Sequence, residues 1–428
     1  MSGPGDFVAD LQFVKKQFYD KDAKEDVPNA SDFSQIMMKK GEKVDLGGLG
    51  LNKIFSSRSA TGAVMSALSE AGSYPSPGFQ SGIKPTLTLS HFVCAVGWTG
   101  HALSMGTSVE ASFQRGSLIE RNLTDLKEKL KRFYARMLMW SGTFILGQIA
   151  AVSGTTGGYL TMATGSAPKN FFEPGDYLTV RDMSTGGSEQ LSNAATGAGR
   201  ILQVRDDLDP FQIVLTDVTG AAAADYVAWL NLYDTTAIDG IRSMVDNTGT
   251  FMGLDRATGA NASMRAYVYG KGGASLSPLD PDKLRDEVAV RAELRNSDYK
   301  LMWVGSHQTR RSFIAATTGQ VRFAGLAKQE LGTPGIEVND RDGTKPFIAD
   351  QYMIDKEVYV VDASKIIHGS PEGMEGGQMV ENNGSPIFQV PGTSTWTDAY
   401  RSYMTLRCAA GMIECRFSGK MTTFTPAT

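Results

Sequence analysis

The chain contains 428 residues, which is enough for two or three domains or for one elaborated domain. Hydrophobic residues make up 41% and charged residues 21%, and this ordinary globular mixture excludes a largely disordered protein. The formal net charge of -4 excludes a protein that attracts nucleic acid through its bulk charge, although a locally basic inner face stays open.

The cysteine content and the apolar runs bear on the compartment. Cys94, Cys408 and Cys415 are too few for a disulfide framework, and no pair has close zinc spacing, so we expect a reducing cytoplasm. No secretion signal is visible after Met1. The longest apolar run, near residues 144–152, is far shorter than a membrane span, so no membrane partner is predicted.

Residues 1–49 are predicted to form an N-terminal arm. Phe7, Leu11 and Phe18 recur at helical spacing, which indicates a short amphipathic helix. Terminal arms fray unless something holds them, so this arm is a candidate contact with another subunit.

Residues 50–100 are predicted to form a long two-stranded hairpin. Two prolines, Pro75 and Pro77, favour a loop tip near residues 70–82, because proline cannot continue a strand ladder. A lone hairpin is only marginally stable in water, so this one needs a neighbour to lie on.

The strongest helix signal lies in the segment 101–171. Ser117 and Glu120 form a capping box at its start. The steps between the apolar positions alternate between four and three residues, which predicts one apolar stripe along a helix over 118–140. No second matching helix exists in the chain, so we favour a helix that lies across a sheet over a coiled coil. The predicted core of this helix consists of Leu123, Leu126, Leu130, Phe133, Met137 and Trp140.

The remaining chain divides into three further parts. Residues 172–233 carry four short strands between loops rich in Gly, Ser, Thr and Ala, which favours a small inserted antiparallel barrel. Residues 234–384 read as an α/β domain, with Asp280 as a candidate helix N-cap and buried strands at Leu301–Val304 and Val358–Val361. Residues 385–428 carry strands that are expected to return to the domain where the chain began.

The sequence contains no recognisable catalytic, cofactor-binding or metal-binding motif. The four histidines are isolated, and Gly270-Lys271-Gly272 lacks the spacing of a phosphate-binding loop. Residues 339–343 lack the ligand spacing of a calcium loop and favour a hairpin turn. We therefore predict no catalytic residue, no cofactor and no metal, and we do not expect an enzyme.

The order of these parts resembles the major capsid protein of tailed double-stranded DNA phages, the Hong Kong 97-type α+β fold. In this resemblance Glu70-Ala71-Gly72-Ser73-Tyr74-Pro75 lies at or near the tip of the extended loop, and the helix from Leu118 is the spine helix of the peripheral domain. The segment 239–256 resembles the entry to the axial domain. The strand and helix of that domain are matched by 299–304 and 307–316. The 172–233 barrel is similar to the insertion domain of some coat proteins.

The resemblance implies a protein that assembles with itself into pentamers and hexamers of an icosahedral shell in the virion. It also implies assembly in the bacterial cytoplasm, a separate scaffold protein, a portal, a possible decoration or cement protein, non-specific contact with packaged double-stranded DNA, and a procapsid that matures by expansion. The residues implied to contact other subunits are Phe7, Leu11, Phe18, Glu70, Tyr74, Pro75, Pro77 and Phe79.

Three other functions fit the sequence less well. An encapsulin-like compartment shares the fold, but this chain is long for one and the barrel insertion argues against it. An enzyme with an α/β domain and a β accessory domain would need a cleft with convergent polar groups, and no motif points to one. A minor virion protein such as a tail component does not explain the long helix and the extended loop.

Overall fold

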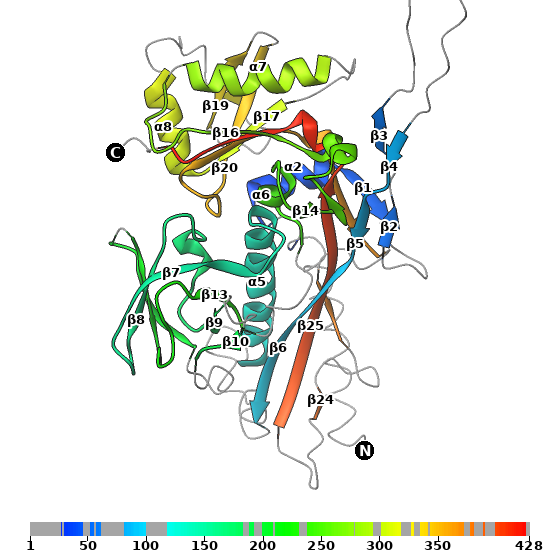
Figure 1. Cartoon of the computed structure of the whole chain (residues 1–428). Helices are drawn as coiled ribbons and strands as arrows, with labels where there is room; N and C mark the ends of the chain where they lie inside the picture. The colour runs from blue at the N-terminus through cyan, green and yellow to red at the C-terminus, as the bar shows by residue number, and fades with distance from the viewer. Residues whose placement is uncertain are drawn as a thin grey trace, which may run out of the picture. The chain divides into compact units, whose positions relative to one another are not determined.

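The computed structural model describes eighteen parts of the chain and divides the chain into two compact units. Unit 1 comprises Met1–Ser56, Lys84–Ala135 and Ser364–Gly411, and unit 2 comprises Ser57–Ile83, Arg136–Ala363 and Met412–Thr428. Figure 1 shows the elements of both units. The described residues are 27, 30–45, 52–54, 57–60, 81–99, 118–182, 188–191, 199–208, 210–230, 238–277, 279–293, 301–317, 327–328, 334–340, 343–371, 377–380, 388–389 and 399–424.

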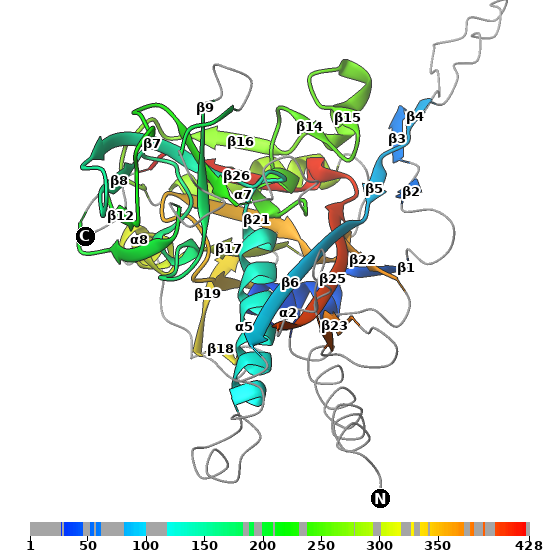
Figure 2. The same cartoon turned by 90° about the horizontal axis from the view of Figure 1, so that it is seen from below.

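Unit 1 is built on a mixed sheet around one long strand. Strand β25 (Ala399–Met412) pairs antiparallel with β6 (Ser90–Thr99), from Ala399 opposite Thr99 to Cys408 opposite Ser90. Both views show these two strands side by side along their length (Figures 1 and 2). The other strands of this sheet are β1 (Glu42–Asp45), β22 (Ile366–Ser370), β23 (Gly377–Met379) and β24 (Phe388–Gln389).

Two antiparallel strand pairs precede β6 in the chain. Strand β2 (Asn52–Ile54) pairs with β5 (Thr86–Thr88), and β3 (Ser57–Ala60) pairs with β4 (Ser81–Ile83). In the sequence the two registers are nested, with Ile54 opposite Thr86 and Ser57 opposite Ile83. The pairing agrees with the hairpin that the sequence predicts, while its expected tip lies outside the described residues.

The long helix α5 (Leu118–Met139) has 22 residues and matches the predicted span closely. Its apolar stripe is buried at Leu123, Leu126 and Leu130. Phe133 is only partly buried, and its ring meets that of Phe92 on β6 edge-on, with centroids 5.1 Å apart. The helix therefore packs against β6 of unit 1. The predicted capping box of Ser117 and Glu120 lies outside the side chains that the structure describes.

A second helix lies where the sequence predicted only an arm. Helix α2 (Asp32–Lys40) begins with a capping box in which the Ser31 hydroxyl accepts from Ser34 N and the Ser34 hydroxyl accepts from Ser31 N. It buries Phe33 and Met37. Strand β1 follows and pairs in parallel with β22, so this part of residues 1–49 belongs to the sheet of unit 1.

The first half of unit 2 is an antiparallel barrel-like sheet with the strand order β10-β9-β13-β7-β8-β12-β11. A bridge between Tyr177 and Arg200 joins the β9 and β11 sides and partly closes it. The prediction that this domain starts at residue 172 is wrong, because β7 and β8 already belong to the sheet. Its strands are β7 (Ile145–Ser153), β8 (Tyr159–Met162), β9 (Leu178–Asp182), β10 (Ser188–Glu189), β11 (Ile201–Arg205), β12 (Gln212–Leu215) and β13 (Tyr226–Trp229).

The second half of unit 2 is a mixed sheet with the order β16-β26-β21-β17-β20-β19-β18, packed with two helices. Helices α7 (Leu279–Glu293) and α8 (His307–Thr317) send Leu284, Val288 and Phe313 into one cluster with Trp303 and Phe347. The strands are β16 (Tyr267–Gly270), β17 (Leu301–Gly305), β18 (Ala327–Lys328), β19 (Pro334–Asp340), β20 (Gly343–Ala349), β21 (Glu357–Asp362) and β26 (Gly419–Thr422).

Strands β17 and β21 are buried along their whole length, which confirms the prediction that both faces are covered. Asp340 opposite Gly343 also confirms the hairpin turn at 339–343. The helices and the many sheets make the fold α+β, as the sequence predicts.

Three sequence predictions about this region need correction. Helix α7 begins at Leu279, so Asp280 is not its N-cap; its carboxylate instead accepts hydrogen bonds from Ser277 N and from the Ser277 hydroxyl. Strand β22, expected in the α/β domain of 234–384, pairs with β1 in unit 1. Strand β26, expected in a returning segment, pairs with β16 and β21 in the central sheet.

Short elements connect α5, the barrel and the central sheet within unit 2. Helix α6 (Ile241–Met244) starts at Gly240, whose backbone lies against the last carbonyl groups of α5. A β-carbon added there would lie 2.2 Å from the Trp140 carbonyl oxygen and 2.4 Å from that of Met137. The others are η1 (Lys169–Phe171), β14 (Thr250–Phe251), β15 (Leu254–Asp255), η4 (Gly259–Met264), η5 (Ala363–Lys365) and η6 (Cys415–Phe417).

The contact at Gly240 predicts a strong effect of adding one methyl group. Gly240→Ala is expected to lower the free energy of unfolding by about 1–3 kcal/mol, because backbone carbonyl groups must move apart. Urea unfolding of the purified protein measures the change. Gly259→Ala is the matched control, since an added β-carbon there meets nothing within 4 Å. Equal stability of the two variants would contradict the close contact.

Candidate functional site: a buried charged junction

The C-terminal turn of α5 carries a buried cation. Arg136 is 4% exposed, its Nη1 lies 3.5 Å from Asp176 Oδ2, and its Nη2 donates to Glu173. Its guanidinium also lies 5.8 Å from the Trp229 ring centroid and 5.9 Å from that of Tyr352. Glu173, Asp176 and Trp229 belong to the barrel, and Tyr352 follows β20 of the central sheet. One side chain of the helix therefore joins both halves of unit 2.

A second arginine lies at the same end of the helix. Arg242 of α6 donates from Nη2 to Glu357 Oε1 at 3.3 Å, and its guanidinium lies 4.6 Å from the Trp140 ring centroid. The Tyr359 hydroxyl donates to Glu357 as well. Burial, and then the charge of Glu357, raise the pKa of Tyr359 well above its ordinary value, so the phenol stays protonated as a donor. This pair ties α6 to β21.

Asp239 precedes α6 and faces the helix end. Its Oδ1 accepts a hydrogen bond from the Ser243 hydroxyl at 3.0 Å. Burial raises its pKa to about 6, while the Ser243 hydrogen bond and the charge of Arg256 act in the opposite direction. A carboxylate with a pKa of about 6 therefore lies directly before α6, close to the end of α5.

Arg256 supports the turn that follows α6. It is 1% exposed and donates to the Met244 carbonyl oxygen at 3.0 Å and to that of Thr248 at 3.4 Å. Its guanidinium lies 4.4 Å from the Phe251 ring centroid. The backbone of residues 244–256 is thus wrapped around one buried cation, the Arg256 guanidinium.

The described part of unit 2 includes one deeply buried thiol, that of Cys415. Burial raises the pKa of Cys415 to about 11, so its thiol is not a nucleophile at neutral pH. In the described ranges no group of three or more His, Cys, Asp and Glu side chains is placed to hold a metal ion. No helix in those ranges is long and apolar enough to cross a membrane. The pairs around Arg136, Arg242 and Arg256 hold elements of unit 2 together.

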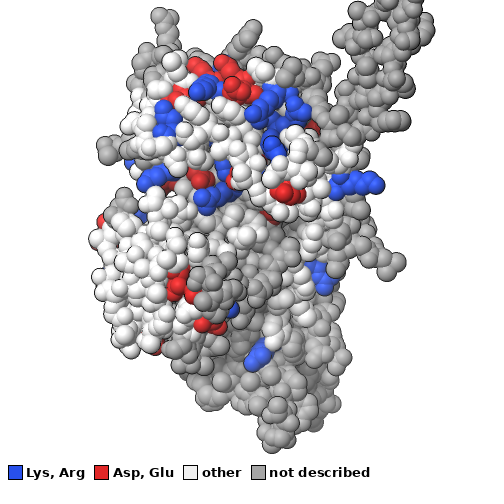
Figure 3. Space-filling view, viewed as in Figure 1, with Lys and Arg blue, Asp and Glu red and all other residues white. Residues whose placement is uncertain are grey.

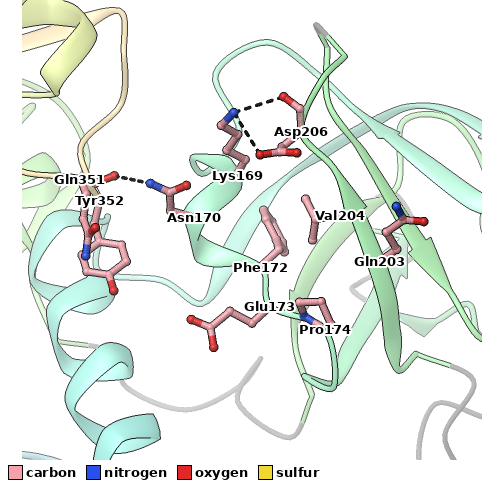
Figure 4. A pocket seen from close by; sticks show the side chains of 10 residues that line it. All are labelled: Lys169, Asn170, Phe172, Glu173, Pro174, Gln203, Val204, Asp206, Gln351 and Tyr352. Carbon is pink, nitrogen blue, oxygen red and sulfur yellow. Dashed lines mark hydrogen bonds and ion pairs between the residues drawn. The ribbon is translucent and has the colours of Figure 1, made fainter.

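A surface hollow of about 400 Å³ lies between the barrel and the loop after β20. Figure 4 shows the side chains that line it. Lys169 Nζ lies 3.5 Å from Asp206 Oδ2 and 3.2 Å from the Asp206 carbonyl oxygen. Asn170 Nδ2 donates to the Gln351 carbonyl oxygen at 3.1 Å. Because these polar groups hydrogen-bond to one another, the hollow marks a contact between the barrel and the loop after β20.

The structure places the residues singled out from the sequence unequally. The helix-core residues Leu123, Leu126 and Leu130 are buried in unit 1, and Met137 and Trp140 are buried in unit 2. Phe133 is half-buried. All the residues expected to contact other subunits lie outside the described residues: Phe7, Leu11, Phe18, Glu70, Tyr74, Pro75, Pro77 and Phe79.

The charged junction was not predicted from the sequence. Arg136 had a visible signal, since it is the one charged residue in the apolar run 133–140. Such a charge is expected to find a buried partner when the run is covered. Arg242 and Glu357 carried no such signal, because they lie 115 residues apart in the sequence.

The chain was compared with known proteins. No protein-family model matches it, and no curated protein matches it by sequence. Among solved structures, it is similar to a chain of the cyanophage A-1(L) capsid asymmetric unit, with 11% identity, a TM-score of 0.46 and coverage of 91% of this chain and 92% of that chain.

Two further similar structures are a chain of the capsid of a native GTA particle and a chain of the satellite phage P4 procapsid that includes the size determination protein. The GTA chain has 8% identity, a TM-score of 0.44 and coverage of 91% and 90%. The P4 chain has 11% identity, a TM-score of 0.38 and coverage of 93% and 97%.

The buried pairing of Arg136 predicts a large loss of stability when the cation is removed. Arg136→Met is expected to lower the free energy of unfolding by about 3–5 kcal/mol, because it removes the cation that Glu173 and Asp176 face. Lys169→Met is the matched control, and the loss of its exposed pair with Asp206 is expected to cost about 0–1 kcal/mol. Urea unfolding measures both, and similar losses would contradict the assigned role of Arg136.

The raised pKa of Asp239 predicts a pH-dependent stability. The folded state binds this proton more tightly than the unfolded state, whose pKa is near 3.8, so the stabilising contribution is complete below about pH 4 and is lost as the pH rises through 6. Asp239→Asn cannot ionise. Its stability relative to the natural chain is therefore expected to rise by about 2 kcal/mol between pH 4 and pH 7.

Urea unfolding of both proteins across pH 4 to 8 measures this difference. Ser243→Ala is a second check: it removes the hydrogen bond that favours the carboxylate, so it is expected to move the transition to higher pH. A difference between Asp239→Asn and the natural chain that stays constant with pH would show that Asp239 titrates normally.

Proposed function

We propose that this chain is the major capsid protein of a tailed double-stranded DNA phage, a structural protein that assembles with itself into an icosahedral shell. One observation carries the proposal, namely the order and pairing of the parts. A paired hairpin leads into the long strand β6, a 22-residue helix packs on that strand, and β25 returns from the far end of the chain to pair with it. The barrel and the α/β sheet are inserted between them.

The hairpin supports an assembling protein for a physical reason. Two short strand pairs cannot stabilise themselves in water, and they need a surface to lie on. In a closed shell the neighbouring subunit supplies that surface, and many modest contacts act together. We assign this contact to the hairpin tip, with Glu70, Tyr74, Pro75, Pro77 and Phe79.

The N-terminal arm is proposed to make a second contact with a neighbouring subunit. Phe7, Leu11 and Phe18 would supply its apolar face. Pentamers and hexamers are the expected capsomers, assembled in the bacterial cytoplasm with a separate scaffold protein and a portal, and with a possible decoration or cement protein on the outside. With a net charge of -4, the coat is expected to touch packaged DNA only non-specifically.

Negative-stain electron microscopy of the purified full-length chain, expressed alone and with its neighbouring genes, tests the function. Uniform closed shells, or rings of five and six, are the expected result. A monodisperse monomer or dimer under both conditions would overturn the capsid function.

A hairpin variant adds a sharper test to the same experiment. Combined Tyr74→Ser and Phe79→Ser substitutions are expected to block shell closure and to leave the thermal unfolding of the unassembled subunit unchanged, because their apolar partners belong to another copy. Val93→Ser, which alters an apolar side chain that is 55% exposed on β6, serves as the control. Normal shells from the double variant would remove the hairpin tip from the assembly contacts.

A further inference from the structure

A strip of exposed side chains follows strand β11, the last strand in the order of the barrel sheet. Leu202 is 49% exposed, and Leu208, in the turn after β11, is 42% exposed. Tyr177 is 43% exposed and lies beside the start of the strand, because it forms a bridge with Arg200. Three of the six large hydrophobic side chains that are exposed among the described residues therefore lie along this one strand.

A β-bulge explains why β11 exposes adjacent residues. Ile201 lies opposite Leu215 and Gln203 lies opposite Val214, so the register shifts at Leu202. An extra residue in one strand interrupts the alternation of its two faces. Leu202 and Gln203 are consequently both exposed. The middle of the strip thus presents one apolar and one uncharged polar side chain.

The two ends of the strip carry opposite charges. Arg200 precedes β11 and Asp207 lies in the turn after it, and both residues are exposed. Neither side chain forms an ion pair with the residues that the structure describes, whereas the neighbouring Asp206 is paired with Lys169. The two charges lie no more than about 25 Å apart, which is the reach of seven extended residues. The β11 strip consists of Tyr177, Arg200, Leu202, Gln203, Asp207 and Leu208.

The barrel carries little charge elsewhere on the face that can be seen. Figure 3 shows that most side chains on the visible face of the barrel are uncharged. The central parts of interfaces between proteins are likewise depleted of charged residues. The barrel therefore has the surface character of a domain that contacts protein.

We propose that the β11 strips of two copies of this chain pack against each other around a two-fold axis, with the two strands antiparallel. A half-turn about an axis beside Gln203 exchanges the two ends of the strip. Asp207 of one copy then faces Arg200 of the other, and Leu208 faces Tyr177, which lies beside Arg200. Each pair occurs twice, because the same surface supplies both halves of the contact.

Charge complementarity selects a second copy as the occupant of this surface. A strip of one sign repels its own copy and needs a partner of the opposite sign. The β11 strip instead balances Arg200 with Asp207 and has apolar groups at both ends, so its complement is the same strip reversed. Nucleic acid is a poorer occupant, because Asp207 would repel the phosphates.

This inference rests on the proposed shell function and adds a contact to it. Rings of five and six subunits need head-to-tail contacts, whereas a two-fold contact joins two subunits without forming a ring. The barrel contact therefore suits subunits of neighbouring rings. A stable interface uses about 20–30 residues on each side, so this short strip is weak in an isolated pair and gains strength when the shell closes.

A charge exchange in the full-length chain tests the contact. Arg200→Glu and Asp207→Arg are each expected to raise the protein concentration at half-maximal assembly by roughly tenfold, because each reversal turns two attractive pairs into two repulsive ones. The two substitutions together are expected to restore most of the loss, since opposite charges face each other again. Sedimentation velocity measures assembly, and circular dichroism checks folding.

The matched controls are charge reversals at exposed positions of unit 2 outside the barrel. They are Arg311→Glu on α8 and Asp355→Arg in the turn before β21, and both are expected to assemble like the natural chain.

A single cysteine distinguishes a two-fold contact from a head-to-tail one. Only a two-fold axis brings the same residue of two copies together, so shells of Gln203→Cys are expected to give disulfide-linked dimers on a non-reducing gel after mild oxidation. Thr219→Cys, in an exposed turn of the barrel outside the strip, is the control. It is expected to remain monomeric on the gel, as is the natural chain.

The other outcomes are distinct. Single charge variants that assemble normally, or a double variant with no restored assembly, overturn the two-fold contact and leave the shell function standing. Equal cross-linking of Gln203→Cys and Thr219→Cys, or none in either, also overturns the contact. Charge variants that fail only when a second protein is present assign the strip to that protein and overturn the contact. A natural chain that forms no assembly under any condition overturns the shell function together with the contact.

Discussion

The buried charge of Arg136 is the constraint on which the architecture of unit 2 depends. A guanidinium removed from water is costly unless carboxylates and aromatic faces replace the lost hydration. Arg136 obtains both, from Glu173 and Asp176 and from the rings of Trp229 and Tyr352. Because these partners come from the barrel and from the loop after β20, the helix end fixes both at once. The same logic extends to Arg242, which joins α6 to Glu357 on β21. Charged pairs thus act beside buried apolar side chains such as Ile241 and Met244 in holding this segment.

Where local signals governed the structure, the sequence predicted it well. The apolar stripe of α5, the buried runs of β17 and β21, and the turn between β19 and β20 each depend on residues within a short window. Helix α2 was missed because its capping box uses Ser34 in place of the usual glutamate or glutamine. The pairing of strands that lie far apart in the chain was also not predicted. Strands β7, β8, β22 and β26 have ordinary strand sequences, and nothing in them states which distant strand they join.

In the candidate site, too, features with a local sequence signal could be predicted and features set by distant partners could not. Arg136 could have been found, since a lone charge within the run 133–140 requires a buried partner. The hollow of unit 2 that Arg265, Arg291 and Arg416 line could not have been found, because these residues meet only through the pairing of β16 with β26 and the packing of α7. Charge on a single side chain is visible in a sequence, whereas the charge of a pocket is a property of the fold.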